Sequence, residues 1–402
     1  MKPVIPPQES TSRSLPRGVL ILGFVSMLMD ISSEMIHGLL PVYLAVGLGA
    51  SALTIGIIEG VAEGTAAIVK IFSGALSDFL GKRKLLVSIG YGLAAFTKPI
   101  FPLASAIEWI IAARFIDRIG KGIRGAPRDA LIADITPKKQ HGAAYGLRQS
   151  MDTVGAFAGP LLAIALMALS GNDFGLVFWI AVIPAFAAFA LVNVGVQEPV
   201  RPQADAEKPV TAPINWRELG KFSGAYWAIV AVGSALTLAR FSEAFLILRG
   251  HELGLALGLA PLVLVVMNIV YSASAYPIGR FSDGRNRLHL IAAGLVVLIA
   301  GDLLMAYSNN LWMLALGVIL WGLHMGFTQG VLSALIADTA PQHLRGTGFG
   351  LFNFITGILM LAASVIAGAL WQGFGSSVTF YAGAAFATIS LLGLALLRGV
   401  KA

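Results

Sequence analysis

Residues 114–160 read RFIDRIGKGIRGAPRDALIADITPKKQHGAAYGLRQSMDTVGAFAGP, and they concentrate charge in a chain that is otherwise poor in it. Long apolar runs border this stretch on both sides. At a helical repeat of about 100° per residue, a set of its charged residues falls within roughly 80°: Arg114, Asp117, Lys121, Arg124 and Arg128. They form a stripe along one helix face. In a membrane, such a stripe has to face a protein interior or a water-filled cavity.

The composition is typical of a polytopic membrane protein. Hydrophobic residues make up 57% and charged residues 12% of the 402 residues, whereas soluble domains carry about 25% charged residues. The apolar runs are about 20–28 residues long, which is enough to cross a hydrocarbon core of ~30 Å. We expect about twelve spans, over residues 18–47, 52–80, 84–104, 106–134, 143–168, 174–196, 222–249, 255–281, 288–307, 311–338, 344–371 and 378–398.

The distribution of Lys and Arg predicts the orientation of these spans. Basic residues gather at both ends of the chain and in every second connection, with Arg249 as the exception. The positive-inside rule then predicts cytoplasmic termini and a multi-pass protein of the inner, cytoplasmic membrane. The net charge of +7 is therefore interpreted as a topology signal and not as a nucleic-acid-binding surface. The absence of cysteine excludes disulfides and thiolate metal sites.

The chain divides into two similar halves. A polar, proline-rich segment at residues 197–221 reads as a cytoplasmic linker between a six-helix bundle at residues 1–196 and another at 222–402. DALIADITPKKQHGAAYGL, residues 129–147, matches SALIADTAPQHLRGTGFGL, residues 333–351, at an offset of 204 (338 − 134 and 350 − 146). Parallel repeats of this kind place a binding site near the midplane between the halves.

The repeated motifs resemble those of the major facilitator superfamily. GALSDFLGKRK, residues 74–84, resembles the superfamily signature between spans two and three. RFIDRIGKG, residues 114–122, is similar to the arginine-containing signature of span four. The antiporter signature of span five is resembled by Gly146, Gly155, Gly159 and Pro160. The resemblance covers essentially the whole chain and points to the drug and metabolite efflux branch. It implies an all-α membrane protein with twelve transmembrane helices in two pseudo-symmetric six-helix bundles.

The turn after the second span is a candidate cytoplasmic gate. A glycine at a crossing lets helices approach closely, and an aspartate beside basic groups makes charge-assisted hydrogen bonds that can break and re-form. In the family, this turn resembles a latch that closes the cytoplasmic side. Positive-inside topology with a capped helix end is the alternative interpretation. The predicted gate residues are Gly74, Asp78, Lys82, Arg83, Asp134, Asp283 and Asp338.

Acidic residues inside the first two spans are candidates for proton coupling. Asp30, Glu34 and His37 share one face of the first span, and Glu59 and Glu63 share one face of the second. A carboxylate at mid-membrane costs roughly 2.5–3.5 kcal/mol on insertion scales. Desolvation can bring the proton exchange of a carboxyl group into the physiological range, so Asp30, Glu34 and Glu63 are our candidates. Permanent ion pairs with the charged stripe are the alternative.

Other intramembrane polar residues are candidates for lining a substrate pathway. The basic stripe can neutralise the acids or attract an anionic substrate, and Arg240 lies at a depth comparable to Asp30. Each residue taken alone also fits an ordinary contact between helices. The candidates are His37, Glu59, Arg114, Arg118, Lys121, Asp152, Arg240, Glu243, Asn268 and His324.

These features predict a secondary active transporter that moves a small organic solute by alternating access, with proton-coupled efflux as the first hypothesis. Proton-coupled uptake by symport is the close alternative. Divalent-metal transport is a further one, because Glu34 and His37 form an E-x-x-H pair. The sequence contains no nucleophile–base signature and no phosphate-binding loop that would indicate an enzyme. We expect a monomer that needs no cofactor and no resident metal, with a small-molecule substrate, protons and the lipid bilayer as its partners.

Overall fold

The structure is a computed structural model that describes residues 15–80, 82–137, 140–198, 220, 222–282, 287–341 and 345–397. Most of the predicted linker and Asp283 of the predicted gate lie outside the described residues. Within them the chain is helical, and no strand is present. The all-α class predicted from the sequence is confirmed.

The helices before the linker are called the first half here. They are α1 (Arg17–His37), α2 (Leu40–Val42), the π-helical turn η1 (Tyr43–Gly47), α3 (Ala52–Leu80), α4 (Arg83–Thr97), α5 (Ile100–Leu103), α6 (Ile107–Ile135), α7 (His141–Ser170) and α8 (Phe174–Gly195). The second half consists of α9 (Gly224–Ala239), α10 (Ala244–Glu252), the 3-10 turn η5 (Leu257–Leu259), α11 (Leu262–Ser282), α12 (Arg287–Tyr307), α13 (Leu311–Thr339), α14 (Arg345–Phe374) and α15 (Ser376–Leu397).

The predicted spans correspond to these helices. Eleven segments of the described chain are long and apolar enough to cross a membrane. The remaining span is α6, whose 29 residues equal α3 in length but carry the charged stripe. Several spans are interrupted: α1 ends before Gly38, and α9 and α10 are separated at residues 240–243. Broken spans at corresponding places in two repeats are typical of transporter binding sites.

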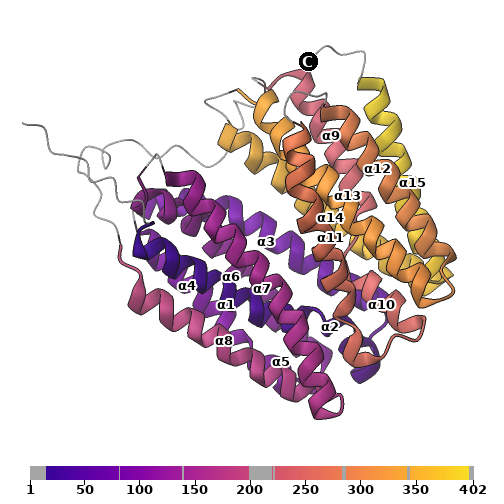
Figure 1. The fold of residues 1–402 in the computed structure, drawn as a ribbon, viewed down its shortest axis with the longest axis horizontal. Helices are drawn as coiled ribbons and strands as arrows, with labels where there is room; N and C mark the ends of the chain where they lie inside the picture. Colours follow the sequence, from indigo (N-terminus) through magenta and orange to yellow (C-terminus); the bar gives the residue numbers. More distant parts are fainter. Residues whose placement is uncertain are drawn as a thin grey trace, which may run out of the picture.

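The two halves repeat one packing scheme. In the first half, α6 packs against both α3 and α4, and α1 packs along α7 and α8 (Figure 1). In the second half, α13 packs against α11 and α12, and α9 packs along α14 and α15. Even single side chains repeat. Arg83 pairs with Asp134 at 3.1 Å, and Arg287 pairs with Asp338, at the same offset of 204 (287 − 83 and 338 − 134).

The halves meet along α3 and α14, whose backbones touch at a row of glycines. A Cβ added at Gly60 would lie 2.8 Å from the carbonyl oxygen of Leu361, and one at Gly64 would lie 3.1 Å from that of Gly357. Contacts this close need residues without side chains. The glycines of α3 therefore permit the tight contact between the halves.

A second contact joins the halves at the end of the molecule away from the chain termini. There α2 lies against α10, and a Cβ added at Gly38 would lie 2.9 Å from Pro261. Figure 1 shows the halves inclined to each other, meeting near α2 and α10 and diverging toward the ends where α1 begins and α15 finishes. We call the end at α2 and α10 the closed end.

The glycine contact predicts the effect of a single substitution. Gly60→Val should push α3 and α14 apart, because overpacking a tight contact costs about 1–3 kcal/mol. The expected result is a longer and broader distance distribution between spin labels at Ile57 and Ile366, measured by pulsed electron paramagnetic resonance. The matched control is Gly393→Val, because a Cβ at Gly393 meets nothing within 4 Å. Identical distributions for Gly60→Val and the control would contradict the prediction.

Candidate functional site

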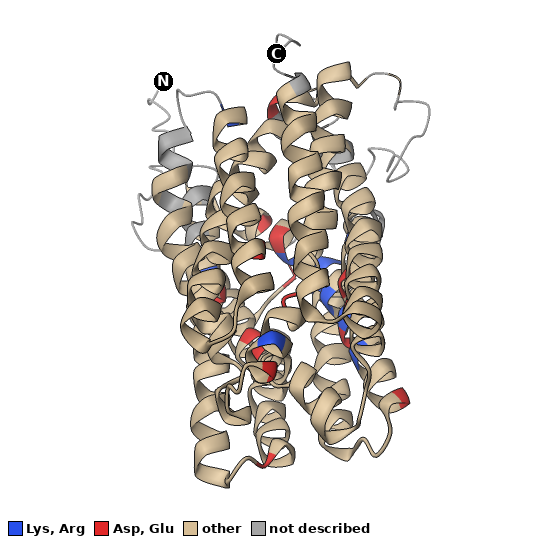
Figure 2. Ribbon diagram, turned by 90° about the vertical axis from the view of Figure 1, so that its right-hand side faces the viewer, with Lys and Arg blue, Asp and Glu red and all other residues tan. Residues whose placement is uncertain are grey.

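Three residues of the charged stripe of α6 lie inside the protein. Arg114, Asp117 and Arg124 are each only 2–6% exposed. They are covered because α6 packs between α3 and α4. Figure 2 shows charged residues gathered between the helices in the middle of the molecule (Figure 2). The expectation that the stripe faces a protein interior is therefore met by these three residues.

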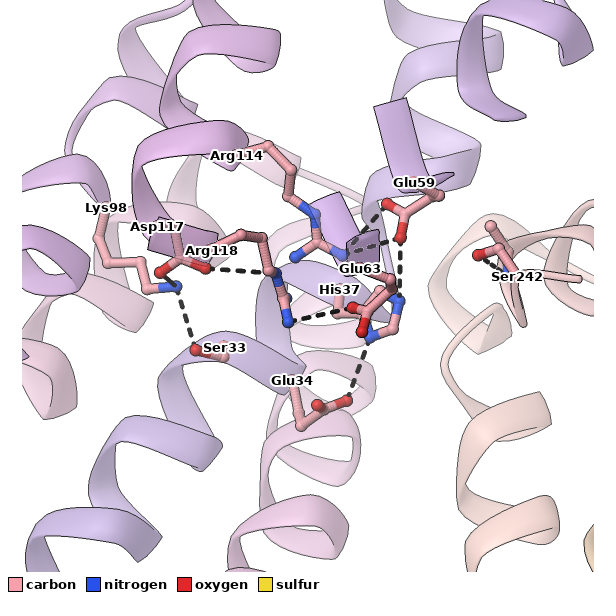
Figure 3. Close-up of polar contacts among 11 residues, drawn as sticks. Ser33, Glu34, His37, Glu59, Glu63, Lys98, Arg114, Asp117, Arg118 and Ser242 are labelled. Atoms are coloured by element: carbon pink, nitrogen blue, oxygen red, sulfur yellow. Dashed lines mark hydrogen bonds and ion pairs between the residues drawn. The ribbon is translucent and has the colours of Figure 1, made fainter. Parts of the chain in front are cut away.

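The first ion-pair chain of the site connects α6, α3 and α1. Arg114 donates from Nη2 to both carboxylate oxygens of Glu59, at 2.9 and 3.2 Å. The imidazole Nε2 of His37 lies 3.6 Å from Oε2 of Glu59, and its Nδ1 lies 3.6 Å from Glu34 (Figure 3). These two distances are longer than hydrogen bonds but within ion-pair range. His37 thus stands between two carboxylates and attracts both only when it is protonated.

The second ion-pair chain connects α3, α6 and the α4–α5 break. Arg118 lies 3.2 Å from Glu63 and 3.6 Å from Asp117. Asp117 accepts a hydrogen bond of 3.0 Å from Lys98, which also donates to Ser33 at 3.1 Å. Figure 3 shows this chain beside the first one. Arg114 and Arg118 are therefore already paired with acids of α3 and α6.

Lys98 was not among the residues singled out from the sequence. Its side chain is fully buried although it lies in an apolar run and next to a helix break. The available signal was its position, because Lys98 is the only Lys or Arg between residues 85 and 104, well inside a predicted span. An ammonium group placed there needs an acid partner, and Asp117 on the stripe supplies it.

The predicted proton-coupling residues differ in their surroundings. Glu63 is paired with Arg118 but its side chain stays 37% exposed, and Glu34 is half-buried beside His37. Asp30 is half-buried and has no ion-pair partner within 4 Å among the described residues. Glu59 is a fully buried partner of Arg114, whereas Asp30 has cations of α6 nearby but, among the described residues, none of them within 4 Å.

The glycines of α7 set the position of the α1 acids. A Cβ added at Gly155 would lie 2.7 Å from the Cβ of Asp30, and one at Gly159 would lie 2.7 Å from the Cβ of Glu34. Pro160 follows within the same helix. The antiporter-like motif predicted from the sequence is therefore the surface on which both acidic residues of α1 rest. The surroundings of Gly146 are outside the described part of the chain.

A further group of charges lies nearer the termini. Arg148 donates to Asp152 at 2.5 Å and lies 3.7 Å from Asp129, which also pairs with Arg128 at 3.3 Å. Lys121 lies between this group and the ion-pair chains along α6 and is exposed. No acid of the described residues comes within 4 Å of Lys121.

The candidates of the second half do not form ion pairs with one another. Arg240 and Glu243 flank the break between α9 and α10, and no acid of the described chain lies within 4 Å of the Arg240 guanidinium. His324 is fully buried and stacks edge-on against Trp321 at a centroid distance of 5.3 Å. Asn268 is half-buried on α11. Charge is thus concentrated in the first half.

The sequence matches a known family over nearly its whole length. Residues 22–248 and 228–401 match the sequence model described as Major Facilitator Superfamily. The chain belongs to this superfamily. An MFS-type transporter of Methanocaldococcus jannaschii is 32% identical over 390 residues, which cover 95% of each chain. Multidrug resistance protein MdtH of Citrobacter koseri is 24% identical over 360 residues, covering 85% of this chain and 83% of its own.

Solved structures agree on the superfamily fold. The crystal structure of nucleoside transporter NupG superposes with a TM-score of 0.77 at 15% identity, over 95% of this chain and 99% of that one. At this identity the likeness concerns the fold alone. The chain is a multi-pass membrane protein with the twelve-helix superfamily fold, as the sequence motifs predicted.

The structure describes only some residues of the predicted gate motif. Gly74 packs toward α6, where an added Cβ would lie 3.3 Å from Ala126, and Lys82 is exposed. The pairs of Arg83 with Asp134 and of Arg287 with Asp338 each stay inside one half. The side chain of Asp78, like Asp283, is outside the described residues. Their role as a gate between the halves stays a prediction.

No three His, Cys, Asp or Glu side chains converge on a geometry that holds a metal ion, within the part of the chain that the structure describes. The acids and His37 are instead engaged in the ion-pair chains. What the arrangement can do chemically is exchange a proton and change the attraction between α1, α3 and α6.

The buried pair of Glu59 and Arg114 predicts a stability effect. Glu59→Gln should lower the free energy of unfolding by about 3–5 kcal/mol, because it leaves Arg114 buried without its carboxylate. The double variant Glu59→Leu with Arg114→Leu removes both charges and should cost clearly less. Thermal unfolding in detergent measures both, with Glu108→Gln on the exposed start of α6 as control. A melting temperature for Glu59→Gln equal to that of Glu108→Gln would refute the pairing.

Proposed function

We propose that this protein is a proton-coupled secondary transporter that exports a small organic solute by alternating access. It acts as a monomer in the inner membrane, with both termini in the cytoplasm. The position of Lys and Arg in the sequence supports this orientation. In this orientation the closed end of the structure faces away from the cytoplasm, so the present arrangement opens inward.

The observation that carries the proposal is the place of His37. It bridges Glu34 of α1 and Glu59 of α3, and both connections depend on a proton on its ring. Gly38, which follows His37 in the sequence, touches the second half at Pro261. Gly60, which follows Glu59, touches it at Leu361. A proton on His37 therefore strengthens contacts right beside the surface on which the halves close.

The mechanism follows from the charges. With His37 protonated, the imidazolium lies between two carboxylates and holds the end of α1 against α3. The end of α1 also favours a cation, because the helix dipole is negative there. When the proton leaves, Glu34 and Glu59 lose this shared cation and repel each other. The end of α1 is then free to shift, and the contacts at Pro261 and Leu361 loosen.

Export is supported by two separate features. The motif of Gly155, Gly159 and Pro160, which resembles the antiporter signature, lies directly against Asp30 and Glu34. The name of one relative, Multidrug resistance protein MdtH, concerns drug resistance, which export of a drug would produce. A protonatable centre adjoining the antiporter-like surface fits exchange of protons for solute. Uptake by symport would use the same proton centre with the solute moving in the opposite direction.

The proposal predicts that proton coupling depends on the His37 centre. In proteoliposomes with an imposed pH gradient, a panel of organic compounds is tested for gradient-driven accumulation. His37→Gln and Glu34→Gln should lower accumulation at least about tenfold, which corresponds to ~1.4 kcal/mol. Asp30→Asn and Glu63→Gln are tested alongside, because both acids are accessible. Solute exchange without a gradient should persist, because these substitutions remove proton-binding side chains and leave the solute pathway intact.

The matched control is His289→Gln, which removes an exposed histidine at the start of α12. It should accumulate solute like the unaltered protein. The proposal fails if His37→Gln, Glu34→Gln, Asp30→Asn and Glu63→Gln all keep full gradient-driven accumulation. The direction of transport is read from the same vesicles, by comparing gradients of opposite sign.

A further inference from the structure

One intramembrane cation of the second half lacks an acid partner among the described residues. Arg114 and Arg118 of the first half are each within 3.2 Å of a carboxylate. In the second half, Arg249 pairs with Glu252 at 2.7 Å and also donates to Ser308 and Ser376. Arg240 differs from all of these, because no Asp or Glu of the described chain lies within 4 Å of its guanidinium.

The groups that hydrogen-bond around Arg240 are polar but neutral, and its nearest acid of the described chain, Glu243, lies beyond 4 Å. Gln329 of α13, with its amide oriented to satisfy both neighbours, accepts from Nη1 and Nη2 of Arg240 at 3.2 Å each. The same amide donates to the hydroxyl of Tyr271 on α11 at 3.0 Å. The Nε of Arg240 is buried without a hydrogen-bond partner in the described part of the chain. One amide oxygen is thus all that these residues offer to a full positive charge.

The position of Arg240 is fixed by the break in its span. Arg240 follows the last residue of α9, and its backbone N–H still bonds to the carbonyls of Leu236 and Thr237. The helix ends there, so the side chain departs from the axis toward α11 and α13. The side chain is only half-buried, which leaves it accessible. Breaks of this kind in transporters lie where solutes bind.

We infer that Arg240 binds the negative group of the transported solute, and that this solute is a small organic monocarboxylate. The inference rests on the proposed transport function. A planar guanidinium matches a carboxylate with two parallel hydrogen bonds, and Gln329 and Tyr271 hold it in place. One unpaired positive charge balances one negative charge. A dianionic phosphate would need a second cation, and no Lys or Arg contact of Arg240 is present among the described residues.

This site differs from the one that the sequence pattern favours. The basic stripe of α6 resembles an anion attractor, but Glu59 and Glu63 already take up the charges of Arg114 and of the neighbouring Arg118. A free anion would have to compete with them. In the second half, Arg240 stands at a helix break and has no carboxylate within 4 Å among the described residues. Solute recognition is thereby assigned to the second half and proton binding to the first.

The test measures binding by the full-length protein in detergent, so it needs no gradient. The probes are monocarboxylates from acetate to benzoate, the matching neutral amides, and inorganic phosphate. At least one carboxylate should raise the melting temperature of the unaltered protein, while its amide and phosphate should not. Arg240→Gln should raise the half-saturating concentration about tenfold or more, because the charge is gone.

A second variant removes the site without removing Arg240. Gln329→Glu is nearly isosteric and places a carboxylate within reach of the guanidinium, so it should weaken binding as strongly as Arg240→Gln. Arg17→Gln, which removes an exposed cation at the start of α1, should bind like the unaltered protein. If every carboxylate affects Arg240→Gln and the unaltered protein alike, or if phosphate alone stabilises, the inference is overturned.

Failure of this inference and failure of the transport proposal give different results. Carboxylate binding through Arg240 without any gradient-driven transport would refute the transport proposal and leave the site standing. Gradient-driven carboxylate transport with an unchanged KM in Arg240→Gln would refute the site and leave transport standing.

Discussion

Charge that is placed within a membrane needs polar partners, and this constraint organises the protein. A buried guanidinium or carboxylate loses its hydration, and a partner of opposite sign or close hydrogen bonds compensate for that loss. Arg114 and Arg118 therefore require the acids of α3, and Asp117 requires Lys98. Together these pairs fix the rotation of α6 about its axis and its place between α3 and α4. Hydropathy alone does not identify α6 as a span, and its own charged residues hold it in position.

The same scaffold carries different chemistry in the two halves. Lys98 and Asp117 correspond to Asp302 and Trp321 at the repeat offset of 204 (302 − 98 and 321 − 117). In the first half this pair is ionic, at 3.0 Å, and in the second half the indole N–H of Trp321 donates to Asp302 at 2.8 Å. The equivalent helices are thus linked at the same positions in both halves, by an ion pair in the first and by a hydrogen bond to a single carboxylate in the second. A duplicated bundle can in this way keep its packing while the chemistry of its polar contacts differs between its copies.

The sequence predicted the spans because each is an apolar run between polar turns, and the helices agree with those runs to within a few residues at most ends. It also predicted that α6 is a span, because a helical stripe of charges bordered by apolar runs fits a membrane-spanning helix whose charged face is turned to the protein interior. It did not predict the partners. Helical spacing places Asp30, Glu34 and His37 on one face but says nothing of which neighbouring helix that face meets. Tertiary packing decides that His37 is linked to Glu59, and that Asp30 meets no cation of the described chain within 4 Å.

Two residues show where topology signals and structure diverge. Arg249 breaks the pattern of basic residues because it is a buried partner of Glu252, Ser308 and Ser376 and not a topology signal. Lys98 was missed in the sequence because a single lysine in an apolar run forms no pattern with other charged residues. Both are explained only when the helices around them are known. Pairing across helices is therefore the information that a single sequence lacks.

The most direct test of the central claim is the reactivity of single cysteines, which the natural chain allows because it contains none. Glu63→Cys and Lys121→Cys are exposed to a charged, membrane-impermeant thiol reagent from the side of the termini. Leu161→Cys and Ile183→Cys, on exposed apolar positions, serve as lipid-facing controls. If the charged network faces an aqueous path between the halves, the first two react rapidly and the controls do not. Reaction of Glu63→Cys and Lys121→Cys no faster than the controls would contradict it.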